Sequence, residues 1–171
     1  TAALGTITCS LCPTGRFGND TGLQSCVPCS PGFNQPNAGE PVCVECTTGR
    51  FTSLSDQANC SPCPLGTFSS ANGTVECAPC DPGSYADEEE LTECKPYKVG
   101  SSAGAYGKDN CDVCSPGTFA ATTGLEECDK CQPKTFGNVT GLTQCYDCSL
   151  GRFSDVPGLS FCKPCETGKY G

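Results

Sequence analysis

Large apolar side chains are scarce in this sequence. Leu, Ile, Val and Phe together account for 27 of 171 residues, about 16%, and there is no tryptophan or methionine. Chains with less than about 20% of these four residues usually cannot bury enough apolar surface to fold alone. The shortage excludes one ordinary globular core, so order has to come from cross-links placed in one local cluster after another.

Histidine is absent, and acidic residues outnumber basic ones by 19 to 10. The usual general base at neutral pH is therefore missing, and we find no nucleophile-elbow serine, phosphate-binding glycine loop or calcium-loop pattern. We expect no catalytic residue, no cofactor, no metal site and no enzyme activity. The net charge of −9 argues against a nucleic-acid partner. No run of about 18 apolar residues is present, so we expect no membrane insertion.

Cysteine, by contrast, makes up 19 of 171 residues, a content typical of disulfide scaffolds. Cys-x-x-Cys pairs recur every 17 residues, with one gap of 34 that Cys94 fills in register. A fixed period indicates a repeat array. Ten registers begin at Cys9, Cys26, Cys43, Cys60, Cys77, Cys94, Cys111, Cys128, Cys145 and Cys162. We predict that residues 1–171 form one continuous array of about ten repeats, with partial repeats at both ends that mark an excerpt of a longer array.

Three other positions of the repeat are also regular, counting the first cysteine of a pair as position 1. Position 7 is glycine except at Lys134, position 14 is usually glycine, and position 9 is usually Phe or Tyr. The glycines predict turns with positive φ. We expect the position-9 aromatic residues to lie against the next disulfide and to form the core together with the Leu residues at position 15. We also expect each loop to have short extended arms and an exposed polar tip, and the chain to have little or no helix.

Paired cysteines have two chemical interpretations, disulfides or zinc. The lack of histidine and the glycine- and proline-rich turns favour disulfides. So do three N-glycosylation motifs, which matter only in a secreted chain, at Asn19, Asn72 and Asn138. The acidic run Asp87–Glu90 is interpreted as a solvated loop tip, with a weak contact to calcium or to a cationic partner as the alternative.

Strict periodicity leaves three disulfide schemes open. The two cysteines of a pair join each other; the second joins the first of the next pair, 14 residues on; or the first joins the second of the next pair, 20 residues on. The 14-residue scheme is favoured because its loop encloses the glycine, the aromatic residue and the polar tip. Tyr97 stands where a cysteine is due, so each scheme leaves a different cysteine unpaired: Cys111 in the 14-residue scheme, Cys77 in the 20-residue scheme and Cys94 in the within-pair scheme.

The repeat resembles the ephrin-receptor-like cysteine-rich repeat of many extracellular proteins of animals and protists. The stretches "CSPCPLGTFSSANGTVEC" (60–77) and "CSPGTFAATTGLEECDKC" (114–131) carry the resemblance. They are also similar to the first loop module of tumour-necrosis-factor-receptor cysteine-rich domains, in which the flanking cysteines pair. The resemblance implies an extracellular setting and a stapled rod, without assigning one activity. It is weakest at the repeat with Tyr97 and with Ser102 in place of the aromatic residue.

The resemblance supports the 14-residue scheme. The implied disulfides are Cys12–Cys26, Cys29–Cys43, Cys46–Cys60, Cys63–Cys77, Cys80–Cys94, Cys114–Cys128, Cys131–Cys145 and Cys148–Cys162. Cys9, Cys111 and Cys165 stay unpaired within this segment. The predicted fold class is a small disulfide-rich repeat protein, an elongated solenoid-like rod of stapled loops and short β-hairpins.

Three functions are compatible with such a chain. The leading hypothesis is a structural glycoprotein, extracellular or at the cell surface, that forms or coats a filament, flagellar hair or cell surface. Its partners would be copies of itself or other filament or coat chains, and N-linked glycans. The regular array favours this hypothesis, because contacts that repeat without closing build helical filaments. The alternatives are a receptor ectodomain stalk or ligand-binding module, and a metal-binding thiol protein.

Overall fold

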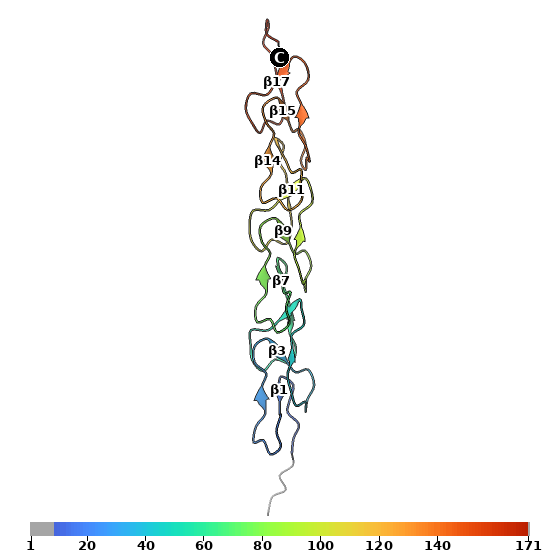
Figure 1. The fold of residues 1–171 in the computed structure, drawn as a ribbon, viewed down its shortest axis with the longest axis vertical. Helices are drawn as coiled ribbons and strands as arrows, with labels where there is room; N and C mark the ends of the chain where they lie inside the picture. The colour runs from blue at the N-terminus through green and yellow to red at the C-terminus, as the bar shows by residue number, and fades with distance from the viewer. Residues whose placement is uncertain (1–8, 171) are drawn as a thin grey trace, which may run out of the picture. The chain divides into compact units, whose positions relative to one another are not determined.

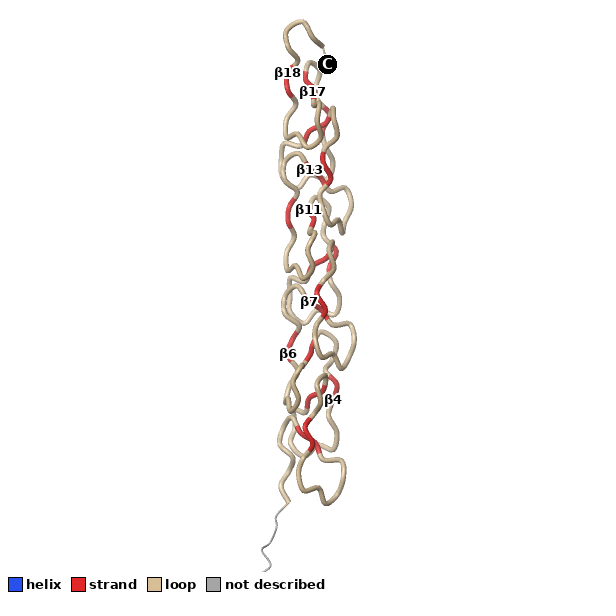
Figure 2. Tube along the Cα trace, turned by 90° about the vertical axis from the view of Figure 1, so that its left-hand side faces the viewer, coloured by secondary structure: helices blue, strands red, loops and turns tan. Residues whose placement is uncertain are grey.

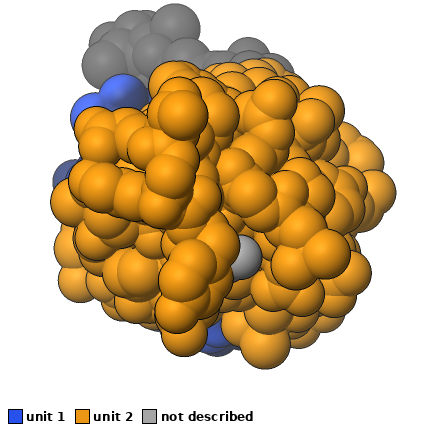
Figure 3. Space-filling view, turned by 90° about the horizontal axis from the view of Figure 1, so that it is seen from above, with its two compact units in different colours: residues 1–63, 69–77 blue, residues 64–68, 78–171 orange. Residues whose placement is uncertain are grey.

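The structure is a computed structural model that describes residues 9–170. The predicted partial repeat before Cys9 lies outside these residues. Contacts divide the chain into two compact units, coloured separately in Figure 3, and each is described by itself. The first unit consists of Thr1–Cys63 and Ser69–Cys77, and the second of Pro64–Phe68 and Ala78–Gly171.

Very short strands are the only regular secondary structure in residues 9–170, and no helix occurs there (Figures 1 and 2). Each strand has two residues. The first unit contains β1 (Arg16–Phe17), β2 (Val27–Pro28), β3 (Phe33–Asn34), β4 (Val44–Glu45), β5 (Arg50–Phe51) and β6 (Ser61–Pro62). The second contains β7 (Thr67–Phe68), β8 (Ala78–Pro79), β9 (Ser84–Tyr85), β10 (Lys95–Pro96), β11 (Ser101–Ser102), β12 (Asp112–Val113), β13 (Thr118–Phe119), β14 (Asp129–Lys130), β15 (Thr135–Phe136), β16 (Tyr146–Asp147), β17 (Arg152–Phe153) and β18 (Lys163–Pro164).

Each strand pairs only with its neighbour in the chain, as an antiparallel hairpin. Positions 8 and 9 of one register face positions 3 and 2 of the next, as in Thr67 opposite Pro79 and Phe68 opposite Ala78. Position 3 is often proline, which has no N–H to extend the ladder. The fold class predicted from the sequence, a disulfide-rich repeat of stapled short hairpins with little or no helix, is confirmed for the described residues.

Within each unit, successive registers are joined by backbone hydrogen bonds at constant offsets. The amide of position 7 donates to position 10 of the next register, position 10 donates to position 15 of the next, and position 14 donates back to position 4 of the preceding one. Examples from the second unit are Gly83 N to Ala103 O (2.9 Å), Ala86 N to Lys108 O (3.0 Å) and Gly107 N to Cys80 O (2.8 Å). The first unit repeats them with Gly32 N to Thr52 O (2.8 Å), Gln35 N to Gln57 O (3.1 Å) and Gly73 N to Cys46 O (2.8 Å). Many backbone N–H and C=O groups thus form their hydrogen bonds with the adjoining register.

The core consists mainly of sulfur and small side chains, with Tyr97 and Gln35 as its larger members, which differs from the expected core of position-9 aromatic residues. Six second cysteines of the pairs are buried, and so are most residues at position 10; these six cysteines are Cys29, Cys46, Cys63, Cys80, Cys114 and Cys131. These position-10 residues are Gln35, Thr52, Ser69, Ala86, Ala103, Ala120, Gly137 and Ser154. The position-9 rings are only half-buried in most registers, and Phe153 is 37% exposed. Of the Leu residues at position 15, Leu142 is buried while Leu23 is exposed. Close spacing of adjoining backbones leaves room for small side chains in the centre and displaces the rings toward the surface.

Candidate functional site

Eight disulfides join cysteines 14 residues apart, with Cα–Cα separations of 5.6–5.8 Å. The first unit contains Cys12–Cys26, Cys29–Cys43, Cys46–Cys60 and Cys63–Cys77. The second unit contains Cys80–Cys94, Cys114–Cys128, Cys131–Cys145 and Cys148–Cys162. Cys9 is free and exposed, and Cys111 and Cys165 are free and half-buried. Every intact register is therefore a loop closed by one covalent staple.

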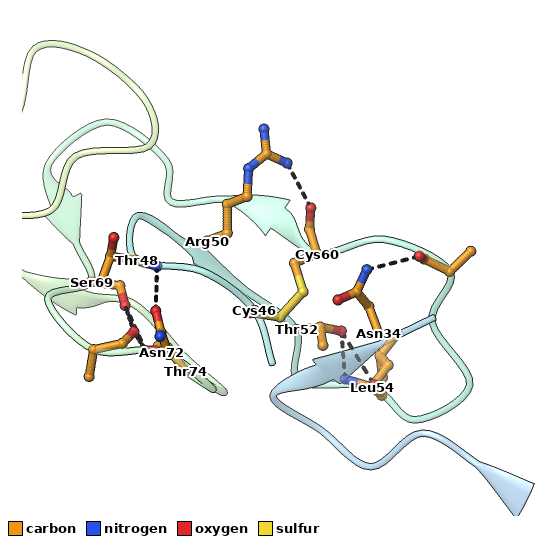
Figure 4. The surroundings of a disulfide bond; sticks show 12 residues. Asn34, Cys46, Thr48, Arg50, Thr52, Leu54, Cys60, Ser69, Asn72 and Thr74 are labelled. Carbon is orange, nitrogen blue, oxygen red and sulfur yellow. Dashed lines mark hydrogen bonds between the residues drawn. A yellow bond between two sulfur atoms is a disulfide. The ribbon is translucent and has the colours of Figure 1, made fainter. Parts of the chain in front are cut away.

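The position-8 side chain supports the backbone beside the staple. Around Cys46–Cys60, Arg50 Nη1 donates a hydrogen bond to the carbonyl oxygen of Cys60 at 3.0 Å (Figure 4). Arg16 and Arg152 make the same contact at their own registers, at 3.4 and 3.1 Å. At five registers position 8 is Ser or Thr, whose hydroxyl donates to the carbonyl of position 5, as Thr67 does to Pro64 at 2.7 Å. Arginine thus adds a side-chain hydrogen bond to the carbonyl of the next register's first cysteine, whereas Ser or Thr adds one to a turn carbonyl that already accepts the backbone amide of position 8.

Tyr97 occupies the place of the missing cysteine. Its side chain is fully buried, although tyrosine is far larger than cysteine. The ring stacks on Tyr85, with centroids 4.9 Å apart and an interplanar angle of 22°. The hydroxyl donates a 2.7 Å hydrogen bond to the carbonyl oxygen of Asn110, the residue before Cys111. One ring and one hydrogen bond thus close the loop that a disulfide closes elsewhere, and Cys111 keeps its thiol.

The neighbouring departure, Ser102, adjusts in a similar way. Its hydroxyl oxygen lies 3.2 Å from Sγ of Cys128 in the Cys114–Cys128 disulfide. Because a disulfide sulfur has no proton, the hydroxyl is the donor. Ser102 thus lies against the next bridge, whereas the ring of Tyr85 lies against Tyr97, which stands where a bridge is missing.

Burial changes the acidity of Tyr97. Loss of solvation, followed by the nearby Cys111 and acidic groups, raises the pKa of Tyr97 from its ordinary value of 10.0 to about 12. Because the unfolded chain releases this proton at lower pH than the folded chain does, the contribution of Tyr97 to stability is complete below pH 10.0. It is lost as the pH rises through about 12. The loop closed by Tyr97 is therefore alkali-sensitive.

We expect the Tyr97→Phe variant to remove one phenol that titrates near pH 12. The phenylalanine ring keeps the stack on Tyr85 but cannot donate to Asn110. The tyrosinate absorbance of both proteins, with free thiols blocked, is followed against pH, and the difference curve isolates Tyr97. A difference curve centred near the ordinary tyrosine pKa would show that Tyr97 is solvated rather than buried.

The three N-glycosylation motifs lie on the surface of their units. Asn19, Asn72 and Asn138 are all exposed. Asn72 accepts a 3.1 Å hydrogen bond at Oδ1 from the amide of Thr48 (Figure 4), which leaves its amide nitrogen, the atom that a glycan would modify, directed away from that contact. Glycosylation of these residues remains a prediction.

Negative charge is concentrated in one stretch of the second unit. Residues 78–129 contain 11 Asp or Glu and 3 Lys, a net charge of −8 out of −9 for the whole chain. Part of it is paired, since Lys95 Nζ lies 2.7 Å from Asp87 and 2.9 Å from Glu88. The hydrogen bond from Lys95 holds the pKa of Asp87 below its usual value. The run Asp87–Glu90 is exposed, in agreement with its interpretation as a loop tip.

Residues 9–170 lack two other features, a metal-binding cluster and a membrane-spanning helix. No three or more Cys, Asp or Glu side chains gather there in an arrangement that could hold a metal ion. The same part of the chain contains no helix able to cross a bilayer.

The stapled loop with its glycines and half-buried ring corresponds to a known module. Residues 15–56 match the family described as tyrosine-protein kinase ephrin type A/B receptor-like. This stretch carries the ephrin-receptor-like repeat. The match includes the whole Cys29–Cys43 loop and covers about a quarter of the chain. No curated protein matches the sequence.

The resemblance inferred from the sequence is thereby confirmed for residues 15–56. The ephrin-receptor-like match and the regular disulfides support an extracellular, receptor-type cysteine-rich module and point to an extracellular or secretory setting. Sequence reasoning missed two features of the site. Tyr97 was identified as a missing cysteine but not as a replacement for the staple. The small residues at position 10 were a visible signal of the core, since eight of nine registers from Gly18 to Ser154 have Gly, Ala, Ser or Thr there.

Proposed function

We propose that this chain is a structural extracellular protein whose repeats form or coat a filament, flagellar hair or cell surface. Its partners are copies of itself or other filament or coat chains. N-linked glycans on Asn19, Asn72 and Asn138 cover part of the exposed surface. The proposal assigns no catalytic role, and the chain has no histidine to serve as a general base.

The constant geometry of the repeat carries this proposal. In both units the same backbone hydrogen bonds recur at the same offsets, and all eight disulfides span 14 residues. No register differs in length, so surface groups recur at equal intervals along the chain. A surface of this kind offers each neighbouring chain the same contact many times, and repeated contacts that do not close produce filaments.

Imaging of the native material by negative-stain electron microscopy tests the proposal. We expect filaments or a continuous coat in which an antibody against this chain labels the structure at regular intervals. A matched sample treated with a strong reductant controls for assembly that does not depend on the fold. Label found only on separate, freely dispersed particles would contradict the structural role.

The family match favours a second candidate, a receptor ectodomain stalk or ligand-binding module. The discriminating observation is the architecture of the full gene product. A membrane-spanning helix followed by a cytoplasmic signalling domain would favour the receptor, whereas further registers of the same 17-residue repeat would favour the filament.

A further inference from the structure

The disulfides define a short covalent path through most of the chain. A staple connects its two cysteines directly and bypasses the 14-residue loop between them, as Cys63–Cys77 does. Only three residue steps then lead to the next staple, at Cys80. Fully extended, one stapled register therefore reaches roughly 16 Å, which is three steps of about 3.4 Å plus one bridge. No pulling force can lengthen it further without breaking a sulfur–sulfur bond.

One part of the path is different. Between Cys94 and Cys114 no staple bypasses the backbone, so 20 consecutive residue steps carry any load. No disulfide closes the loop between Tyr97 and Cys111. It is held by non-covalent contacts: the Tyr85 stack, the hydrogen bond to Asn110, the pairing of β11 with β12, and the exposed Lys108–Asp112 ion pair at 3.2 Å.

The backbone contacts at Tyr97 are also the longest of their kind. The amide of Tyr97 donates to Gly83 O at 3.2 Å, whereas the corresponding cysteine amides of the described registers donate at 2.8–3.0 Å. The carbonyl of Tyr97 accepts from Gly124 N at 3.1 Å, whereas the corresponding carbonyls accept at 2.8–2.9 Å. The non-covalent closure is thus looser than the closure of its stapled neighbours.

We propose that loop 97–111 is a release point, which opens under tension and lengthens the chain while the stapled loops hold. Opening frees 14 residue steps and adds roughly 40 Å to the path, at about 3.4 Å per step less the distance at which the closed ends lie. Tyr97 is the latch, because the closing contacts of its side chain are the ones that replace the disulfide. The inference concerns the isolated chain and stands whether or not the chain builds filaments.

Single-molecule stretching between the two ends of the chain tests the release directly. We expect one reversible step of roughly 40 Å, which no stapled register can produce. The Tyr97→Cys variant, whose new cysteine can pair with Cys111, is the matched control and should lack that step. The Tyr97→Ala variant should release at lower force. An unmodified chain without the step, or a step of equal size and force in the Tyr97→Cys variant with the bridge verified, would overturn the proposal.

Limited trypsin digestion provides a second readout in bulk. A cut after Lys98 or Lys108 divides the chain on a non-reducing gel, whereas cuts within stapled loops leave the pieces joined. We expect division at these lysines to appear first as denaturant is added, and to disappear in the Tyr97→Cys variant. Fragment masses separate these cuts from one after Lys130, which lies between staples. Division at Lys130 before Lys98 and Lys108 would contradict a release point in loop 97–111.

Discussion

Replacing Gly66 by alanine is expected to destabilise the second unit by about 2–5 kcal/mol. Gly66 has φ of 78°, which costs an L-residue about 1–2 kcal/mol. A Cβ atom there would also overlap the backbone carbonyl of Gly107, whose carbon would lie 2.7 Å away. Backbone cannot move aside as a flexible side chain can, so overpacking adds about 1–3 kcal/mol.

The partner glycine of the same contact provides the control. Gly107 also has positive φ, 69°, but a Cβ there would lie 3.7 Å from Pro79 and 3.9 Å from Gly66 O, with room to spare. We therefore expect Gly107→Ala to cost only the dihedral contribution, about 1–2 kcal/mol. Hydrogen exchange of the Gly66 and Gly107 amides, which donate to Ala86 and Cys80, measures the local stability. Equal losses in the two variants would show that the dihedral, and not the close approach, requires glycine at position 7.

Removing one staple is expected to cost about 3 kcal/mol of local stability. The double variant Cys63→Ala, Cys77→Ala opens the loop between two cysteines 14 residues apart, and the chain-entropy model assigns about that value to such a loop. The loss of packing around the fully buried Cys63 adds to it. The control is Cys111→Ala. Cys111 occupies the same repeat position as Cys77 but is free, so its replacement breaks no bridge.

For Cys111→Ala we expect a change below about 1 kcal/mol, since surface and half-buried substitutions that break no special feature have small effects. Hydrogen exchange around each site, at matched pH and temperature, gives the comparison. If the double variant were as stable as Cys111→Ala, the staples would not be what holds each register closed.

Much of this fold was accessible from the sequence because covalent cross-links impose their period on it. Equal spacing of the cysteines limited the bridges to three schemes, and the structure has one of them throughout. Glycine at position 7 likewise predicted positive φ, which Gly66 shows. Lys134 has φ of 75° at the same position, so positive φ alone does not demand glycine. The added requirement, an approach by the backbone 41 residues later, involves two registers at once. The sequence pattern of a single register therefore does not reveal this second requirement for glycine.

The same limit applies to the core and to the latch. Aromatic residues at position 9 were expected inside because they are the largest apolar groups available, but buried position-10 residues such as Ala86 and Ala120 occupy the centre. The distance between two adjoining backbones determines which side chains are buried. That distance cannot be inferred from the sequence of one register. At Tyr97 the sequence showed which staple was missing. Its burial against Tyr85 and its bond to Asn110 depend on residues 12 and 13 positions away.

The central claim is that covalent staples at a constant interval take the place of an apolar core. Circular dichroism of the native protein, recorded before and after complete reduction and blocking of its thiols, tests it most directly. We expect the folded signal to disappear on reduction under conditions without denaturant. A spectrum that stays unchanged after verified reduction would contradict the claim, because the remaining apolar contacts would then be sufficient to hold the registers together.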